Sequence, residues 1–280
     1  MLRKLSLLLN PFCLGWVMAI ALVPLAHAAT TQLAPSKDNT LIQQTNPASQ
    51  LSNGLGDISA GRTNQDGQGT ATISIRRGLV AFDVAGNVPP GATITSVLLT
   101  MREVTGLDGD PTVGLYRVLQ DWGEGNSFQN GGAGAAAQNG DATWLYTFFN
   151  AANPPASPTW STPGGNFAAA VSNSAIVFDD LGAGQLFSWS SASNPQMLAD
   201  VQSWLDNPAT NFGWALLGDE SKGQTTKRFN SGESTLAPNV PPALTINYHV
   251  PEPAGLALWT IAAICMACAV FARKGRISIA

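Results

Sequence analysis

The C-terminal end of this chain carries an uncharged apolar stretch that does not fit into a water-soluble fold. Residues 254–272 contain no charged side chain, and 19 helical residues span about 28 Å, enough to cross the hydrocarbon core of a bilayer. Arg273, Lys274 and Arg276 follow directly, and basic residues stay on the cytoplasmic side of a span. We therefore expect a transmembrane helix with a basic tail, residues 273–280, and the rest of the chain across the membrane.

The N-terminal end has the pattern of a secretory signal peptide. Two basic residues precede an apolar segment, residues 5–25, and Ala26 and Ala28 fill the small-residue positions of an A-x-A cleavage site. We expect residues 1–28 to be removed, which makes Ala29 the mature N-terminus. A retained membrane helix is the alternative, but two prolines in the segment disfavour it.

The order of the C-terminal features resembles a PEP-CTERM sorting signal, which would cover residues 249–280. Pro251, Glu252 and Pro253 stand before the apolar span and the basic tail. The resemblance implies recognition by an exosortase-type membrane protease, a temporary anchor, and a Gram-negative host that makes exopolysaccharide. The alternative is an ordinary tail anchor in which the triplet is only a stiff, helix-breaking spacer.

All three cysteines lie in the two terminal segments, so the exported domain between them contains none. Cys13 lies in the signal segment, and Cys265 and Cys268 lie in the expected span, where their C-x-x-C spacing is not a redox or zinc motif. Residues 29–248 then form one domain without a disulfide, long enough for a sizeable β core.

The domain is acidic but poor in charged residues. It contains nine basic and 17 acidic residues, a net charge of −8, and it has no basic run, which argues against nucleic acid as a partner. Charged residues are 11% of the chain, against roughly 25% in ordinary soluble domains. A neutral polar surface of this kind suits contact with sugars and hydrated matrix, although many exported β proteins share it without binding anything.

The hydrophobic periodicity of the domain is that of β-strands. Strand patterns occur at residues 72–76, 79–82, 96–102, 112–119 and 243–248, with shorter apolar pieces at 175–178, 186–189 and 213–217. Breaks rich in glycine, proline and asparagine separate them. We predict an all-β fold, a two-sheet antiparallel β-sandwich.

One short helix is predicted after Asn194. Asn194 is a favourable N-cap, and Pro195 is tolerated at the first helical position. Leu198, Val201 and Leu205 recur at helical spacing, and an Asn-Pro pair ends the pattern. We interpret this segment as a helix that closes one end of the sandwich.

Several segments taken together resemble the DNRLRE family. In chain order they are residues 79–83, 88–94, 97–99, 115–118, 121–125, 201–204, 211–214 and 228–233. The resemblance covers almost all of residues 36–248 and implies a jelly-roll-like β-sandwich of exported proteins, related to carbohydrate-binding modules. The chain departs from the family pattern at a low-complexity segment, residues 129–140, and a Pro-rich segment, residues 153–163, which make the middle of the domain longer and looser.

The residue types of the domain exclude most nucleophilic and zinc chemistry. His27 leaves with the signal peptide, and His249 lies beside the anchor. The fold therefore offers neither imidazole nor thiolate to a Ser-His-Asp site, a Cys-His site or a zinc ion.

Carboxylate pairs remain as the one catalytic possibility, as in glycosidases. Asp121 with Glu124, and Asp219 with Glu220, are the candidate pairs. The first pair also fits a loop-fixing motif, and the second fits a solvated turn. We expect no catalytic residue and no enzyme.

A structural calcium ion is the only cofactor that the sequence suggests. Asp108 and Asp110 alternate on a tight turn, as in calcium loops, and Asp179 with Asp180 is a second candidate. An ordinary acidic turn is the default interpretation in both places.

The candidate sugar-binding residues are three tryptophans beside loops. Trp122, Trp144 and Trp160 lie next to segments rich in glycine, aspartate and proline, where an exposed ring could stack on a glycan. Large aromatic rings on loops more often anchor those loops to the sandwich, and this is the favoured interpretation. The other three tryptophans of the domain stand in apolar, periodic contexts and are predicted to lie in the core.

Together these features predict an exported, transiently anchored protein of the cell surface or the biofilm matrix. Its expected partners are an exosortase-type protease and exopolysaccharide. The alternatives are a purely structural or adhesive matrix component and, less favoured, a glycan-cleaving enzyme.

Overall fold

The computed structural model describes residues 27–44, 49–63, 75–106, 109, 111–178, 184–234 and 240–251. Residues 28–250 form one compact unit. The expected membrane span and these processing residues lie outside the described part: Ala26, Glu252, Pro253, Arg273, Lys274 and Arg276. Within the described ranges, no helix has the length and apolar character needed to cross a membrane.

The described residues form a mostly β fold with one α-helix. The strands are β1 (His27–Leu33), β2 (Lys37–Ile42), β3 (Leu51–Ser52), β4 (Ile58–Arg62), β5 (Ile75–Ala81), β6 (Thr93–Gly106), β7 (Thr112–Val118), β8 (Ala135–Ala136), β9 (Phe167–Ile176), β10 (Leu186–Ser190), β11 (Trp214–Leu217), β12 (Lys227–Phe229) and β13 (Ala243–Val250). The helix α1 is Pro195–Asp206, and short 3₁₀ turns are η2 (Pro154–Ala156) and η3 (Pro208–Thr210).

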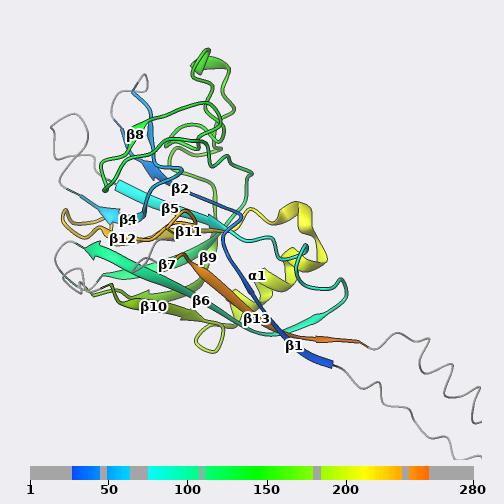
Figure 1. Ribbon diagram of the computed structural model, residues 1–280. Coiled ribbons are helices and arrows are strands. Elements are labelled where there is room, and N and C mark those ends of the chain that lie inside the picture. The colour runs from blue at the N-terminus through cyan, green and yellow to red at the C-terminus, as the bar shows by residue number, and fades with distance from the viewer. Residues whose placement is uncertain are drawn as a thin grey trace, which may run out of the picture. The chain divides into compact units, whose positions relative to one another are not determined.

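The strands form an antiparallel sheet that curls round to give two facing layers (Figure 1). The first layer has the strand order β2-β5-β11-β7-β9, and the second has the order β10-β6-β13-β1. Strands β4 and β12 join the layers, because β12 pairs with both β6 and β4, and β4 pairs with β5. The arrangement is β-sandwich-like, as the strand patterns predict.

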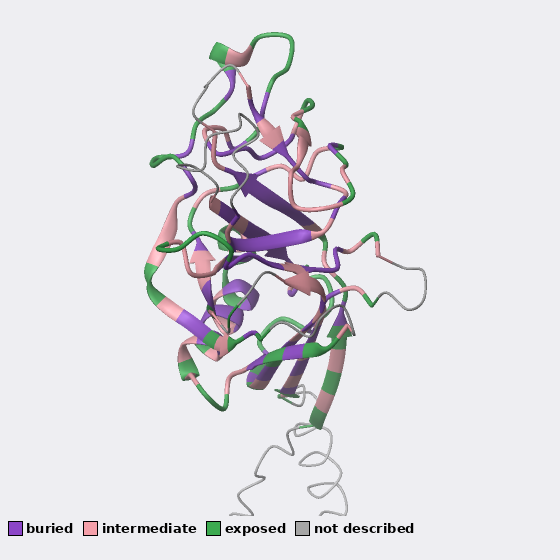
Figure 2. Cartoon of the chain, turned by 90° about the vertical axis from the view of Figure 1, so that its left-hand side faces the viewer, coloured by how far each residue is buried: buried purple, intermediate pink, exposed green. Residues whose placement is uncertain are grey.

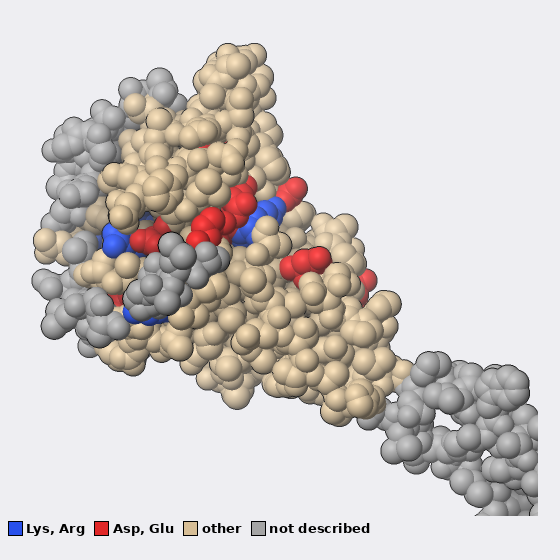
Figure 3. Space-filling view, viewed as in Figure 1, with Lys and Arg blue, Asp and Glu red and all other residues tan. Residues whose placement is uncertain are grey.

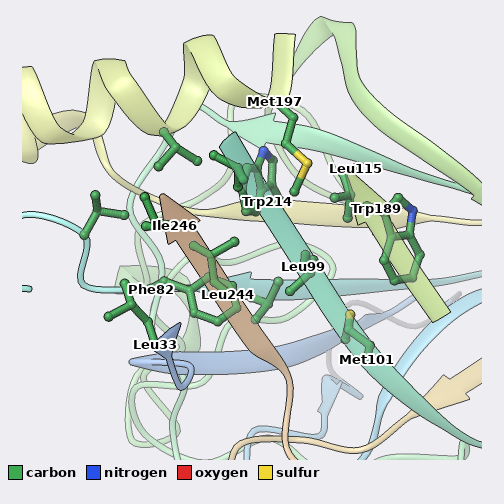
Figure 4. Close-up of a cluster of buried hydrophobic side chains, with 14 of the residues drawn as sticks. Leu33, Phe82, Leu99, Met101, Leu115, Trp189, Met197, Trp214, Leu244 and Ile246 are labelled. Carbon is green, nitrogen blue, oxygen red and sulfur yellow. The ribbon is translucent and has the colours of Figure 1, made fainter. Parts of the chain in front are cut away.

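The main core lies between the two layers (Figure 4). In β6 the buried residues Val97, Leu99 and Met101 alternate with the partly exposed Thr100 and Arg102. This alternation confirms the strand pattern seen in the sequence, since successive side chains of a strand point to opposite faces.

The helix α1 closes this core, as predicted. The side chain of Asn194 accepts a hydrogen bond from the backbone N–H of Gln196 (3.0 Å), and Pro195 stands in the first turn. The buried face of the helix includes Met197 and Trp204, and Figure 4 shows Met197 reaching from the helix towards the core.

A second, smaller core lies on the opposite face of the first layer. The segment 119–166, between β7 and β9, packs over this face. Figure 2 shows strands coloured as buried in the middle of the molecule. The strand residues Leu79 and Ala81 point into the second core, while Val80 points into the main core. Because the end of β5 is covered on both faces, its last three residues, Leu79 to Ala81, are all apolar.

The two ends of the compact unit lie side by side. Strands β1 and β13 are neighbours in the second layer (Figure 1). The hydroxyl of Thr30 donates to the side-chain oxygen of Asn247 (2.5 Å), and the amide of Gln32 donates to the hydroxyl of Thr245 (3.3 Å). Ala28, the predicted last residue of the signal peptide, lies at the start of β1. A chain that begins at Ala29 keeps both of these hydrogen bonds.

Candidate functional site

The three tryptophans considered for sugar stacking all lie in the second core. Trp122 is 0% exposed, Trp144 is 8% exposed and Trp160 is 3% exposed. The indole N–H of Trp122 donates to the carbonyl of Phe212 (2.8 Å), and that of Trp160 donates to the carbonyl of Thr143 (2.9 Å). The rings anchor the segment 119–166 to the sheet, so the expectation of an exposed stacking face is corrected at all three positions.

The first candidate carboxylate pair is bonded to strand β2. Asp121 accepts a hydrogen bond from the ammonium of Lys37 (2.7 Å). The same ammonium donates to the carbonyl of Trp122 (2.6 Å). Glu124 accepts one from the backbone N–H of Asp38 (2.8 Å). These bonds hold the start of the segment 119–166 against the strand, which is the loop-fixing interpretation of the sequence.

The second pair belongs to a turn. Asp219 accepts hydrogen bonds from the hydroxyl and the N–H of Ser221, and these bonds lower the pKa of Asp219. Glu220 accepts two hydrogen bonds from the guanidinium of Arg77, at 2.7 and 2.9 Å. The sequence-based calcium candidates Asp108, Asp110, Asp179 and Asp180 fall outside the described residues.

An acidic cluster that the sequence analysis did not identify lies beside the start of β2. It consists of Asp38 in β2, Glu124 in the segment 119–166 and Glu233 in the turn after β12. One carboxylate oxygen of each residue lies within 4.8 Å of those of the other two. Asp38 is buried, Glu124 is half-buried and Glu233 is exposed, so the acidic cluster leads from the interior to solvent. Figure 3, viewed as in Figure 1, shows acidic side chains gathered near the middle of the molecule, with basic side chains beside them.

Asp38 is the most constrained member of the acidic cluster. Its side chain is 0% exposed, its Oδ2 accepts the N–H of Gly232 (2.7 Å), and its Oδ1 has no hydrogen-bond partner. Burial raises the pKa of Asp38, and the nearby carboxylates of Glu233 and Glu124 raise it further, against the opposing hydrogen bond from Gly232. Burial also raises the pKa of Glu124.

Two basic side chains, Lys37 beside Asp38 in β2 and Arg228 in β12, form ion pairs with acids outside the acidic cluster. Lys37 pairs with Asp121 (2.7 Å), and Arg228 pairs with Asp57 (3.0 Å). Across the described ranges, no ion pair to Asp38, Glu124 or Glu233 is formed. The three carboxylates therefore lie together without a direct ion pair, although the nearby ammonium of Lys37 opposes the raised pKa of Glu124.

An open cleft of about 460 Å³ lies on the face of the first layer that carries the second core. It lies near the N-terminal end of β7, whereas Val118 at the C-terminal end packs into the second core. We call it the outer cleft, and it is lined by Thr112, Gly114, Tyr116, Val171, Ser174, Leu217, Gly218 and Glu220. Within β7, the residue Val118 lies in the second core, whereas Thr112, Gly114 and Tyr116 on the same face line the outer cleft.

The half-buried ring of Tyr116 lies against Gly114. A Cβ atom added at Gly114 would stand 2.8 Å from the ring atom Cε2 of Tyr116, so glycine leaves the space that the ring occupies on the sheet. Glu220 is held at the other side of the outer cleft by Arg77. The outer cleft thus combines an aromatic ring, hydroxyl groups and a fixed carboxylate.

No protein-family model matches this chain, and no curated protein matches it at a significant level.

Proposed function

We propose that the chain is an exported, carbohydrate-associated β-sandwich of the jelly-roll type that acts at the cell surface or in an exopolysaccharide matrix. The observation that carries this proposal is the outer cleft. An aromatic ring offers an apolar face to a pyranose ring, while hydroxyl and carboxylate groups bond to sugar hydroxyls. Tyr116, Ser174 and Glu220 supply these groups within one open cleft.

The arrangement of the ends is consistent with transient anchoring. Strands β1 and β13 are neighbours in the second layer, so the mature N-terminus and the start of the C-terminal tether belong to that layer and not to the first layer, which carries the outer cleft. The PEP-CTERM-like order of residues 251–280 supports processing by an exosortase-type protease, and the DNRLRE-like motifs support the jelly-roll topology.

Binding to polysaccharide is tested by affinity electrophoresis of the purified domain, residues 29–249. We expect the host exopolysaccharide to retard the domain, and Tyr116→Ala to weaken this binding about tenfold, equivalent to roughly 1.4 kcal/mol. Phe128→Ala is the control, because Phe128 is 61% exposed and lies outside the outer cleft. This variant should bind like the parent domain.

Other outcomes of this experiment select the alternatives. A domain that migrates normally in every polysaccharide of the host contradicts the proposal and leaves a purely structural or adhesive matrix role. Release of reducing ends from the polysaccharide would instead indicate a glycan-cleaving enzyme.

Processing at the C-terminus is a separate expectation. Strand β13 ends at Val250, and Pro251 directly after it is exposed. From the sequence, two prolines in the triplet disfavour a helix and favour an extended segment, which suits a protease at the membrane surface. We expect mass spectrometry of the extracellular protein to find a C-terminus near Pro253. Intact residues 273–280 on the extracellular protein would show that this sorting proposal is wrong.

A further inference from the structure

We propose that the acidic cluster of Asp38, Glu124 and Glu233 is a binding site for a single calcium ion. This inference is independent of the sugar-binding proposal, because the acidic cluster and the outer cleft share no residue. It also differs from the calcium loops that the sequence suggests, since its three ligands come from distant parts of the chain.

The buried oxygen of Asp38 is the strongest indication. Asp38 is 0% exposed, so water does not reach its carboxylate. The Oδ1 atom of this carboxylate is buried and has no hydrogen-bond partner. A carboxylate oxygen in the interior without a partner loses its solvation and receives nothing in return. Two further carboxylates lie beside Asp38, which adds repulsion between like charges. A divalent cation bound between the three groups removes both costs.

The spacing of the three carboxylates fits one ion. Calcium binds oxygen at about 2.3–2.6 Å, so two oxygens that share the ion can lie up to about 5 Å apart. The three carboxylate oxygens lie within 4.8 Å of one another, inside this limit. The exposed Glu233 leaves the site open on one side, where water can complete the six to eight ligands that calcium takes.

The donor set favours calcium over the other common ions. Every side-chain ligand is a carboxylate, and oxygen ligands select hard cations over zinc or copper. Magnesium demands a nearly ideal octahedron and gives up its water reluctantly, whereas calcium accepts irregular carboxylate sites. A strand, a long segment and a turn supply the three ligands here, and such a site has no reason to be octahedral.

A calcium ion would fasten three separate segments together. Asp38 belongs to the edge strand β2, Glu124 lies near the start of the segment 119–166 that covers the second core, and Glu233 follows β12. The folded chain presents all three ligands together, whereas the unfolded chain does not. Calcium therefore stabilises the folded state by mass action.

The test is thermal unfolding of the full-length protein, purified in detergent and followed by tryptophan fluorescence. At a calcium concentration about 100 times the dissociation constant, we expect the midpoint to rise by about 5–10 °C. A chelator should reverse the rise. Magnesium should produce a clearly smaller one. No response to calcium, or an equal response to magnesium, would overturn the assignment.

Asp38→Asn separates binding from general stability. The amide has the shape of the carboxylate but no charge, so without calcium the variant should unfold at the same temperature as the parent or higher. It should lose the response to calcium. Asp206→Asn is the matched control at an exposed position of α1, and it should respond like the parent.

A second variant and a second readout cover the case in which Asp38→Asn does not fold. Glu233→Gln changes an exposed member of the acidic cluster and should also reduce the response to calcium. Terbium, a luminescent substitute for calcium, should give tryptophan-sensitised emission that excess calcium abolishes in the parent and that is weak in both variants. Undiminished emission and an unchanged midpoint shift in both variants would contradict the site.

Discussion

Replacement of Trp204 by alanine is expected to lower the free energy of unfolding by about 3–5 kcal/mol. The ring is 0% exposed and packs edge-to-face on Trp214, with 4.6 Å between the ring centroids. Truncation would remove this aromatic contact and leave a large cavity where α1 covers the main core. Denaturant-induced unfolding, with the slope checked for a common unfolded state, measures the change.

Trp204→Phe is the control for this substitution. The indole N–H of Trp204 is buried and has no hydrogen-bond partner, so phenylalanine keeps an aromatic contact and removes an unsatisfied donor. This variant should lose much less stability than Trp204→Ala. A loss below about 1 kcal/mol for Trp204→Ala would contradict the role of the ring as a central core residue.

Trp144 illustrates where sequence reasoning misjudges a side chain. Its neighbourhood of glycine and aspartate suggests an open loop, and on that basis truncation should cost much less than at Trp204. The structure instead buries the ring in the second core, with the guanidinium carbon of Arg77 4.8 Å from the ring centroid. The sequence carries no local signal for this burial, because it results from the packing of the whole segment 119–166 on the first layer.

The elements that the sequence predicts correctly are those with local signals. The alternation in β6 and the cap at Asn194 each depend on residues within one strand or one helical turn. The strand pattern at residues 112–119 likewise matches β7, which ends one residue earlier. Local periodicity was sufficient to predict these elements, because their apolar faces pack into the core as the pattern indicates.

The acidic cluster could not be predicted in the same way. Asp38 and Glu124 are 86 positions apart, and Glu233 is further along the chain. They meet only because β2 pairs with β5, and because β12 joins β4 and so brings the turn after it near β2. The one usable signal is Asp38 itself, a charged residue inside a strand whose residues from Asp38 to Ile42 are all buried. A buried carboxylate of this kind points to a partner that lies elsewhere in the chain.

Glu103→Ala is expected to lower the free energy of unfolding by about 3–5 kcal/mol, because it removes one partner of a buried ion pair. The side chains of Glu103 in β6 and Lys227 in β12 are both 0% exposed, with 3.8 Å between Nζ and Oε1. Without the carboxylate, the buried side chain of Lys227 loses this ion pair in the interior. The pair lies where β12 joins the two layers, so the loss should also loosen that junction.

Two comparisons make this prediction specific to the buried charge. Asp121→Ala breaks the more exposed pair with Lys37, whose side chains are 56% and 24% exposed, and should cost less than about 1 kcal/mol. Replacing Glu103 and Lys227 together by methionine removes both charges and should recover most of the stability that Glu103→Ala loses. If Glu103→Ala proves no more damaging than Asp121→Ala in denaturant unfolding, the buried pair does not hold β12 to β6. The junction of the two layers would then depend on its backbone ladder and on the apolar packing of Phe229.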